Sequence, residues 1–347
     1  MTVTGPVPAD ELGWCQSHEH ILIRKGQPFA VDSALLMDEP DRSLAELCRY
    51  RDAVHRKAGS ADTPVRPEIL FCSVVDAQPG GCGRMASELR ELSRRSGVRI
   101  IASTGFHKLC YYPEDHWIRR ASADELAGWF IEELAAGMYE DDAAGRPDDL
   151  REAETVLPGY RTDIRAGQIK TAWDTGGYTG QYAVLFEAAA LAHAATGVPV
   201  MIHVEQGTDP RPLMHFLRLR GVAAEKMIFC HMDRACPDLR MHMDIAAEGA
   251  YLEYDTIGRF KYHSDEEEIR IFKELIAAGC LDRLLFSLDT TRKRMGSYDG
   301  TEITLSYIAE VFLDKMEQAG IGRDAIRKIA YDNPAGAFEP ERASHCI

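Results

Sequence analysis

The chain has 347 residues, of which 45% are hydrophobic and 27% are charged, so it is not a disordered, collagen-like or low-complexity protein. Its 55 Asp and Glu residues outnumber its 40 Lys and Arg residues, which gives a net charge of −15. A surface of this charge repels nucleic acids and anionic membranes, so we expect a small-molecule partner and neither of those two. A local basic pocket for a small anion is compatible with this charge.

The sequence also bears on the compartment. It contains no run of 18 or more apolar residues, so we expect no transmembrane helix. The first residues, MTVTGPVPADELGW, have neither the basic region nor the apolar region of a signal peptide. The nine cysteines are an odd number without a CxxC pair, which is typical of reduced thiols. We therefore expect a cytoplasmic protein.

Short apolar runs alternate with amphipathic stretches along the whole chain. The predicted strands are Trp14–Ile23, Ile69–Val75, Val98–Phe106, Ile164–Thr171, Val198–Val204, Met227–Met232, Ala250–Ile257 and Leu284–Leu288. The predicted helices are Ser43–Arg56, Arg84–Arg95, Ala123–Tyr139, Tyr182–Thr196, Pro212–Arg220, Asp238–Glu248, Asp265–Ala278 and Thr304–Gln318. Several of these helices are followed by glycine, as helix ends require.

Eight strand-then-helix units predict an α/β fold of the (β/α)8 TIM barrel type, with a doubly wound open sheet as the alternative. The number of units and the lack of a glycine fingerprint after the first strand favour the barrel. No Pro-, Gly- or Ser-rich linker divides the chain, so we expect a single domain over residues 1–347. The acidic, polar segment 140–158 is expected to be a loop excursion before the fourth strand.

In such a barrel the active site lies at the carboxyl ends of the strands. Residues of metal-ligand chemistry stand at five of these ends, namely His18 and His20, Lys170, His203, His231 and Asp289. Two histidines at i and i+2 on one strand point to the same side and can bind one metal ion. A single histidine at a strand end is more often a hydrogen-bonded core residue, and a buried lysine is more often in an ion pair. Six such residues at matching ends favour a joint metal site.

At this point the sequence resembles the phosphotriesterase-like branch of the amidohydrolase superfamily. The resemblance rests on Leu12-Gly13, His18-Glu19-His20, Gly167-Gln168-Ile169-Lys170, His203, His231, Asp289 and Asn333-Pro334-Ala335, and extends from about Gly13 to Phe338. It implies a barrel with a binuclear centre in which His18, His20 and Asp289 bind one metal ion. His203 and His231 would bind the other ion. Lys170, carboxylated by CO2, would bridge both, with Zn²⁺ as the expected metal and Mn²⁺ or Co²⁺ as alternatives.

The resemblance also implies a mechanism. A hydroxide that bridges the two metal ions would attack the substrate, and Asp289 would carry its proton to the leaving group. Organophosphate-cleaving members of the branch resemble one another in having a histidine at the end of the seventh strand. Here residues 253–258 read EYDTIG, without histidine, which favours ester or lactone cleavage. Barrels of this branch are often dimers, and a homodimer is the assembly that the resemblance suggests.

Two basic loops bear on the substrate. His107, Lys108 and Tyr111 follow the third strand, and Arg292 and Lys293 follow the eighth. These loops are similar to those of enzymes in the same branch that hydrolyse phosphorylated sugar lactones, with a basic pocket for the distal phosphate. We therefore expect Lys108, Arg292 and Lys293 to contact phosphate, and His107 and Tyr111 to contact the substrate. A solvated basic loop paired with nearby acids is the alternative.

Three other functions are kept open. A neutral or acyl-homoserine lactonase would need an apolar channel, and a promiscuous organophosphate triesterase would need large apolar leaving-group pockets. A metal-bound binding protein without turnover is the third. Asp76 and Asp233, at the ends of the second and sixth strands, are expected to orient a metal ligand or to lie in the barrel floor. His116 and His263 are expected in loops on the active-site side.

Overall fold

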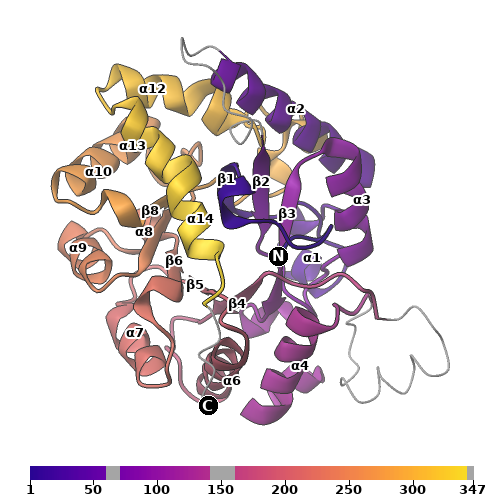
Figure 1. Cartoon of the computed structure of the whole chain (residues 1–347). Coiled ribbons are helices and arrows are strands. Elements are labelled where there is room, and N and C mark those ends of the chain that lie inside the picture. The colour runs from indigo at the N-terminus through magenta and orange to yellow at the C-terminus, as the bar shows by residue number, and fades with distance from the viewer. Residues whose placement is uncertain (60–70, 141–160, 342–347) are drawn as a thin grey trace.

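The computed structural model describes residues 1–59, 71–140 and 161–341. Within these ranges eight parallel strands form one sheet in the order β1 to β8, inside a ring of helices (Figure 1). The strands are β1 (Trp14–Glu19), β2 (Cys72–Asp76), β3 (Arg99–Gly105), β4 (Gln168–Ala172), β5 (Val200–His203), β6 (Met227–Cys230), β7 (Tyr251–Tyr254) and β8 (Leu284–Phe286). The strand order follows the chain without the reversal of a doubly wound sheet, so the predicted (β/α)8 barrel is confirmed.

Each predicted helix overlaps an observed one. The long helices are α2 (Pro40–Gly59), α3 (Ala86–Ser96), α4 (Ala123–Ala135), α6 (Gln181–Thr196), α7 (Arg211–Arg218), α9 (Leu239–Ala247), α10 (Asp265–Ala277) and α12 (Leu313–Gln318), the last continuing a π-helical turn at Ile308–Phe312. The structure adds the short helices α1 (Gln27–Val31), α8 (Met232–Ala235), α11 (Gly296–Asp299), α13 (Arg323–Arg327) and α14 (Asn333–Phe338). These escape prediction because one or two turns are too short to establish an apolar period.

Six of the eight predicted strands are too long at their carboxyl ends, whereas β2 and β4 each extend one residue beyond the predicted end. The apolar run of the sixth strand continues to Met232, yet β6 ends at Cys230 because His231 adopts a left-handed backbone with φ 62°. Asp289, after β8, has φ 50°. Left-handed backbone is unusual for residues with a side chain and interrupts the ladder. The chain therefore leaves the sheet at the residues whose side chains form the site.

Side chains close the barrel between its first and last strands. The Ser287 hydroxyl accepts the His18 N–H at 2.9 Å, and the Asp289 N–H donates to the His18 carbonyl at 3.1 Å. The buried Glu19 carboxylate accepts the N–H groups of Leu288 and Thr290 at 3.0 and 3.1 Å. Burial raises the pKa of Glu19, although these hydrogen bonds oppose the shift. This polar seam fixes His18 and Asp289 relative to each other.

The opposite end of the barrel is covered. Helix α14 crosses it beside the short 3-10 helix Ala9–Glu11, in front of the strands in Figure 1. Asn333, at the start of α14, donates its amide to the carbonyls of Leu281 and Leu284, both at 2.8 Å. The carboxyl ends of the strands are thus the end where a site can form.

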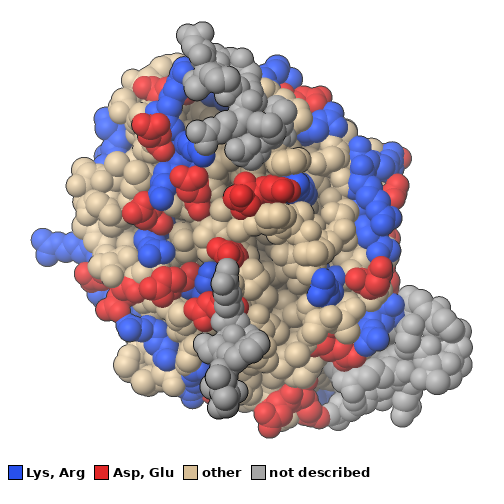
Figure 2. All heavy atoms as spheres, viewed as in Figure 1, with Lys and Arg blue, Asp and Glu red and all other residues tan. Residues whose placement is uncertain are grey.

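Lys and Arg are interspersed with Asp and Glu on the face shown in Figure 2. None of the described helices is both long enough and apolar enough to cross a bilayer. The excursion predicted for residues 140–158 lies outside the described residues apart from Glu140. The flanks of that segment meet in an antiparallel bridge between Tyr139 and Arg161.

A buried ion pair attaches α4 to the barrel wall. Arg84, in the loop before α3, and Glu133, on α4, are both fully removed from solvent. The Arg84 guanidinium donates to Glu133 and to the Ser103 carbonyl on β3, each at 2.9 Å. Thr104, also on β3, donates its hydroxyl to the same carboxylate at 2.6 Å. The pair therefore joins α4, β3 and the Arg84 loop.

We predict that Glu133→Ala lowers the free energy of unfolding by about 3–5 kcal/mol, because it leaves the Arg84 charge buried without its partner. Urea denaturation measures the change. The double variant Arg84→Met/Glu133→Leu removes both charges and should lose less than the single variant. A loss below about 1 kcal/mol for Glu133→Ala would contradict this role of the pair.

Candidate active site

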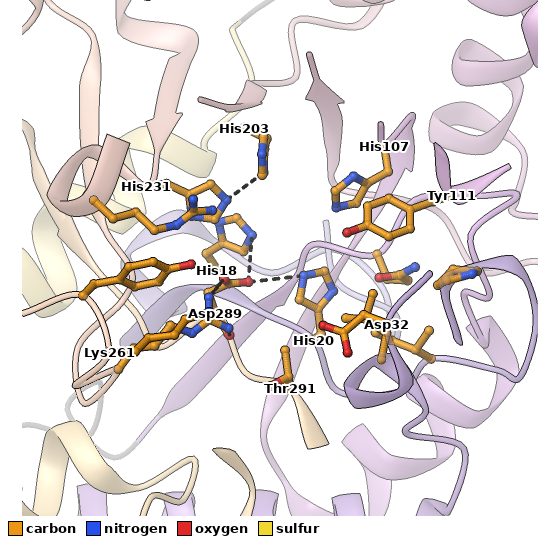
Figure 3. Close-up of a pocket in the computed structure, with 17 residues that line it drawn as sticks. His18, His20, Asp32, His107, Tyr111, His203, His231, Lys261, Asp289 and Thr291 are labelled. Atoms are coloured by element: carbon orange, nitrogen blue, oxygen red, sulfur yellow. Dashed lines mark hydrogen bonds and ion pairs between the residues drawn. The ribbon is translucent and has the colours of Figure 1, made fainter. Parts of the chain in front are cut away.

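A cavity of about 210 Å³ opens at the carboxyl ends of the strands. His18 and His20 reach it from the end of β1, His203 from β5, His231 from the turn after β6 and Asp289 from the turn after β8. Figure 3 shows these side chains converging, with Lys261 on one side and His107, Tyr111 and Asp32 on the other. The structure brings together the five predicted metal ligands that line this cavity, and Lys170 lies directly beneath them.

Lys170 is fully buried on β4, and its Nζ lies 3.1 Å from His18 Nε2. In the described part of the chain no carboxylate lies within ion-pair distance of Lys170. An imidazole lone pair offers a buried ammonium much less than a carboxylate would. The alternative of a buried ion pair, considered for Lys170 from the sequence, is therefore not what the described residues form.

His18, His20 and Asp289 form one group of ligand atoms. Asp289 Oδ1 lies 3.5 Å from His20 Nε2 and 3.9 Å from His18 Nε2, and the three ligand atoms lie within 4.8 Å of one another. His20 Nδ1 is buried and has no hydrogen-bond partner among the described residues. Two imidazoles and a carboxylate at this spacing are the ligands that divalent transition-metal ions prefer.

His203 and His231 form a second pair. His231 Nε2 lies 2.8 Å from His203 Nδ1, so two ring nitrogens face each other across the cavity floor. Burial lowers the pKa of His203 to about 4 and holds that of His231 well below its usual value. Both imidazoles are therefore neutral near pH 7, which is the form that binds metal ions.

Two carboxylates of β7 and its end orient the histidines. The Nδ1 of His18 lies 2.9 Å from Glu253 Oε2 and 3.1 Å from Asp255 Oδ2. Asp255 Oδ1 lies 2.6 Å from the Nδ1 of His231. Because carboxylates hold both Nδ1 atoms, the Nε2 of each ring is turned toward the other predicted ligands. One aspartate thus positions a histidine from each predicted ligand group.

The sequence analysis did not single out Glu253 and Asp255 for this part. It considered Asp76 and Asp233, which accept other hydrogen bonds, Asp76 from the Ile21 N–H and Asp233 from residue Thr256. The spacing of Glu253 and Asp255, at i and i+2 on an otherwise apolar strand, was the signal that could have found them, since such residues face the barrel interior together.

Asp289 also contacts a residue that the sequence analysis missed. Arg259, in the loop after β7, donates to Asp289 Oδ2 at 2.9 Å and to its carbonyl at 3.1 Å. Burial alone raises the pKa of Asp289, but Arg259 and His20 outweigh it and hold the pKa well below its usual value. The carboxylate is therefore charged and available as a metal ligand or proton acceptor.

The predicted substrate residues fall into two sets. His107 and Tyr111 line the cavity, with their ring centroids 4.6 Å apart. Lys108, Arg292 and Lys293 are not among the residues that line it in the described chain. Lys108 pairs with Glu205 and with Asp174, and Arg292 pairs with Asp299 at 2.9 Å and with Glu39 at 3.6 Å. For Arg292 this is the arrangement of a basic loop paired with nearby acids.

Other cations line the cavity. Arg234, Arg259 and Lys261 surround the ring of Tyr262, with their charged groups 5.4, 5.8 and 4.6 Å from its centroid. We call these four residues the cationic wall. Within the described ranges Arg234 and Lys261 have no carboxylate within ion-pair distance. The sequence pattern that could have pointed to this wall is the run Arg259-Phe260-Lys261-Tyr262 after the seventh strand, which contains two cations.

Comparisons with known proteins agree with this geometry. The model of the phosphotriesterase family matches residues 1–144 and 153–338. The phospho-furanose lactonase of Mycoplasmopsis synoviae (strain 53) is 26% identical over 353 residues, which cover 98% of this chain and 92% of that protein. The N-acetyltaurine hydrolase of Tetraodon nigroviridis is 26% identical over 377 residues, which cover 96% of this chain and 95% of that protein.

Among solved structures, an amidohydrolase from Mycoplasma synoviae superposes with a TM-score of 0.84 at 24% identity. The match covers 98% of this chain and 92% of that chain. At this identity the likeness supports the fold and nothing finer.

We predict that Zn²⁺ raises the melting temperature and that a chelator reverses the rise, because the ion would bind the folded chain and not the unfolded one. Metal at 100 times its dissociation constant stabilises the fold by about 2.7 kcal/mol per site. Differential scanning calorimetry of stripped and Zn²⁺-reloaded protein measures the shift. The shift should be smaller for Lys170→Met, and equal melting temperatures for stripped and reloaded wild-type protein would contradict the prediction.

Proposed function

The chain belongs to the phosphotriesterase family, and from this premise we propose that it is a metal-dependent hydrolase that opens a phosphorylated sugar lactone. The observation that carries the substrate class is the cationic wall, where Arg234 and Lys261 face the cavity without an acidic partner in the described chain. A protein with a net charge of −15 gains nothing from unpaired cations in a cavity unless an anion binds there.

The residues of the cavity fit two divalent ions. His18, His20 and Asp289 would hold one ion, and His203 with His231 would hold the other. Lys170 as a carbamate would contact both, which replaces a buried ammonium by an anion. When bound, such ions activate water as a nucleophile and polarise the carbonyl group of a substrate. The unpartnered His20 Nδ1 and the two facing ring nitrogens of the second pair support this fit.

The protein's own groups would do the remaining work. The charged Asp289 carboxylate can take the proton of the attacking water and deliver it to the ring oxygen when the carbon–oxygen bond of the lactone breaks. Arg234, Lys261 and the Tyr262 hydroxyl would hold the distal anionic group. His107 and Tyr111, on the opposite side of the cavity, would contact the sugar part. Water adds across one bond, and the product is a hydroxy acid.

A second candidate is an amidase for a small sulfonated amide. It is supported by the N-acetyltaurine hydrolases, which match this chain as closely as the lactonase does. A sulfonate would use the same cationic wall as a phosphate. An acyl-homoserine lactonase or an organophosphate triesterase would need apolar walls where Arg234, Arg259 and Lys261 lie.

The cationic wall is tested by two matched arginine variants. We expect Arg234→Ala to raise KM for a phosphorylated lactone by about 10–100-fold, because a charged hydrogen bond is worth roughly 1.5–3 kcal/mol. Arg292→Ala removes a cation that is already paired outside the cavity and should change KM by less than about threefold. Steady-state kinetics on phosphorylated and unphosphorylated aldonolactones, N-acetyltaurine, an acyl-homoserine lactone and paraoxon measures both variants.

A larger effect of Arg292→Ala than of Arg234→Ala would move the anion site to the loop after β8. Faster turnover of N-acetyltaurine than of any lactone would replace the lactonase proposal by the amidase.

The role of Asp289 gives a separate prediction. Asp289→Asn keeps the shape of the side chain but cannot accept a proton, and we expect kcat to fall by about 10²–10⁴-fold. The metal content of the variant is measured on the same sample, so that loss of metal and loss of proton transfer are told apart. A variant with full metal content and a kcat within threefold of wild type would refute this role.

A further inference from the structure

A further group of metal-binding residue types lies outside the cavity. It consists of Asp233 on α8, His263 in the loop after β7 and Glu268 on α10, and one ligand atom from each lies within 4.8 Å of the others. None of the three is among the residues that line the cavity. Nothing in the proposed function uses them.

The most unusual member is Glu268. Its side chain has no exposed surface, and in the part of the chain that the structure describes neither carboxylate oxygen accepts a hydrogen bond. The His263 Nε2 lies 3.1 Å from Glu268 Oε2, but the contact does not have hydrogen-bond geometry. A buried carboxylate without donors is costly, because it has lost its water and gained nothing in return.

His263 presents a ring nitrogen to three oxygens. Its Nδ1 lies 3.4 Å from the Ser264 carbonyl oxygen, so Nε2 is the ring nitrogen that points at the other three groups and would bind a cation once it has lost its proton. Around Nε2 lie Glu268 Oε2 at 3.1 Å, the Thr256 hydroxyl oxygen at 3.1 Å and Asp233 Oδ2 at 3.8 Å. The Thr256 hydroxyl is 2.7 Å from Asp233 and donates to it, so it cannot also donate to the ring.

The surroundings carry an excess of negative charge. Burial, followed by the charges of Asp233, Asp255 and Asp265, holds the pKa of Glu268 well above its usual value. Asp233 itself already accepts the backbone N–H groups of Arg234 and Thr256. A single imidazolium N–H can point at only one of the surrounding oxygens, whereas a cation between them would contact all three ligands at once.

We propose that Asp233, His263 and Glu268 form a third metal site, which takes a divalent first-row transition-metal ion such as Zn²⁺ through one imidazole nitrogen and two carboxylate oxygens. Ligand bonds of about 2.0–2.2 Å place neighbouring ligand atoms roughly 3.4 Å apart in a tetrahedral site. The distances of 3.1 and 3.8 Å from His263 Nε2 lie on either side of that value. Water would complete the coordination.

The site would have a structural effect on the cavity. Asp233 precedes Arg234 on α8, and His263 follows Tyr262 in the loop after β7, so the ion would fasten both segments of the cationic wall to α10. The metal site itself does not depend on the proposed function, because its ligands are separate from the predicted binuclear centre. Its occupancy can therefore be measured without any substrate.

The test is the number of Zn²⁺ ions per chain after equilibrium dialysis at micromolar free Zn²⁺ with bicarbonate, measured by mass spectrometry of the metal. We expect Glu268→Gln and His263→Gln each to hold one ion fewer than wild type. Glu266→Gln removes an exposed carboxylate of the same helix and should match wild type. Circular dichroism confirms the fold of each variant, and His263→Gln carries the comparison if Glu268→Gln does not fold.

Equal Zn²⁺ content in wild type, Glu268→Gln and His263→Gln would overturn the third site and leave a His263 imidazolium as the neutralising charge. A loss of one ion in Glu266→Gln as well would also overturn it, because the loss would then follow surface charge. Failure of the binuclear centre would instead lower the count of every variant alike, so the two proposals fail in different ways.

Discussion

Lys170 is surrounded by the barrel interior, without solvent contact and with an imidazole nitrogen as its nearest partner. As an ammonium it would place a positive charge beside His18, in the same site as His203 and His231, which burial keeps neutral. The cost of burying this charge disappears if Lys170 is carboxylated to an anionic carbamate that two divalent cations bind. The neighbouring groups are consistent with that form of the lysine. Glu253 and Asp255 fix the ring orientations, and the left-handed turns at His231 and Asp289 bring their side chains to the same cavity.

The same polar residues also limit how the barrel closes. Ser287 and Glu19 complete the seam between β1 and β8 by side-chain hydrogen bonds, and the seam holds the backbone of His18 next to that of Asp289. The seam that closes the barrel thus also fixes His18 and Asp289, two residues of one proposed metal-binding group. Because the predicted ligand side chains already lie close together in the folded chain, few of them would have to move when metal ions bind.

Much of the fold, and the convergence of the predicted ligand residues on one cavity, could be predicted from the sequence, because both rest on patterns of short range. Apolar runs indicate strands, and polar residues at the carboxyl ends of these strands converge at one end of a barrel whatever the conformation of the loops. The cationic wall could not be chosen this way. Arg292 and Arg259 both stand in basic loops, and only the three-dimensional structure shows that Asp299 pairs with Arg292 while Arg259 faces the cavity. The pairing of Asp255 with two histidines from different strands is likewise a property of the folded barrel.

The central claim of this account is that Lys170 is present as a carbamate held by two divalent ions. Carbon-13 NMR of the Zn²⁺-loaded protein, prepared with carbon-13 bicarbonate, tests it most directly. The account predicts one carbamate resonance in the wild-type protein that is absent from Lys170→Met and is lost when a chelator removes the metal. A fully metal-loaded wild-type protein without that resonance would contradict the claim and require another partner for the buried lysine.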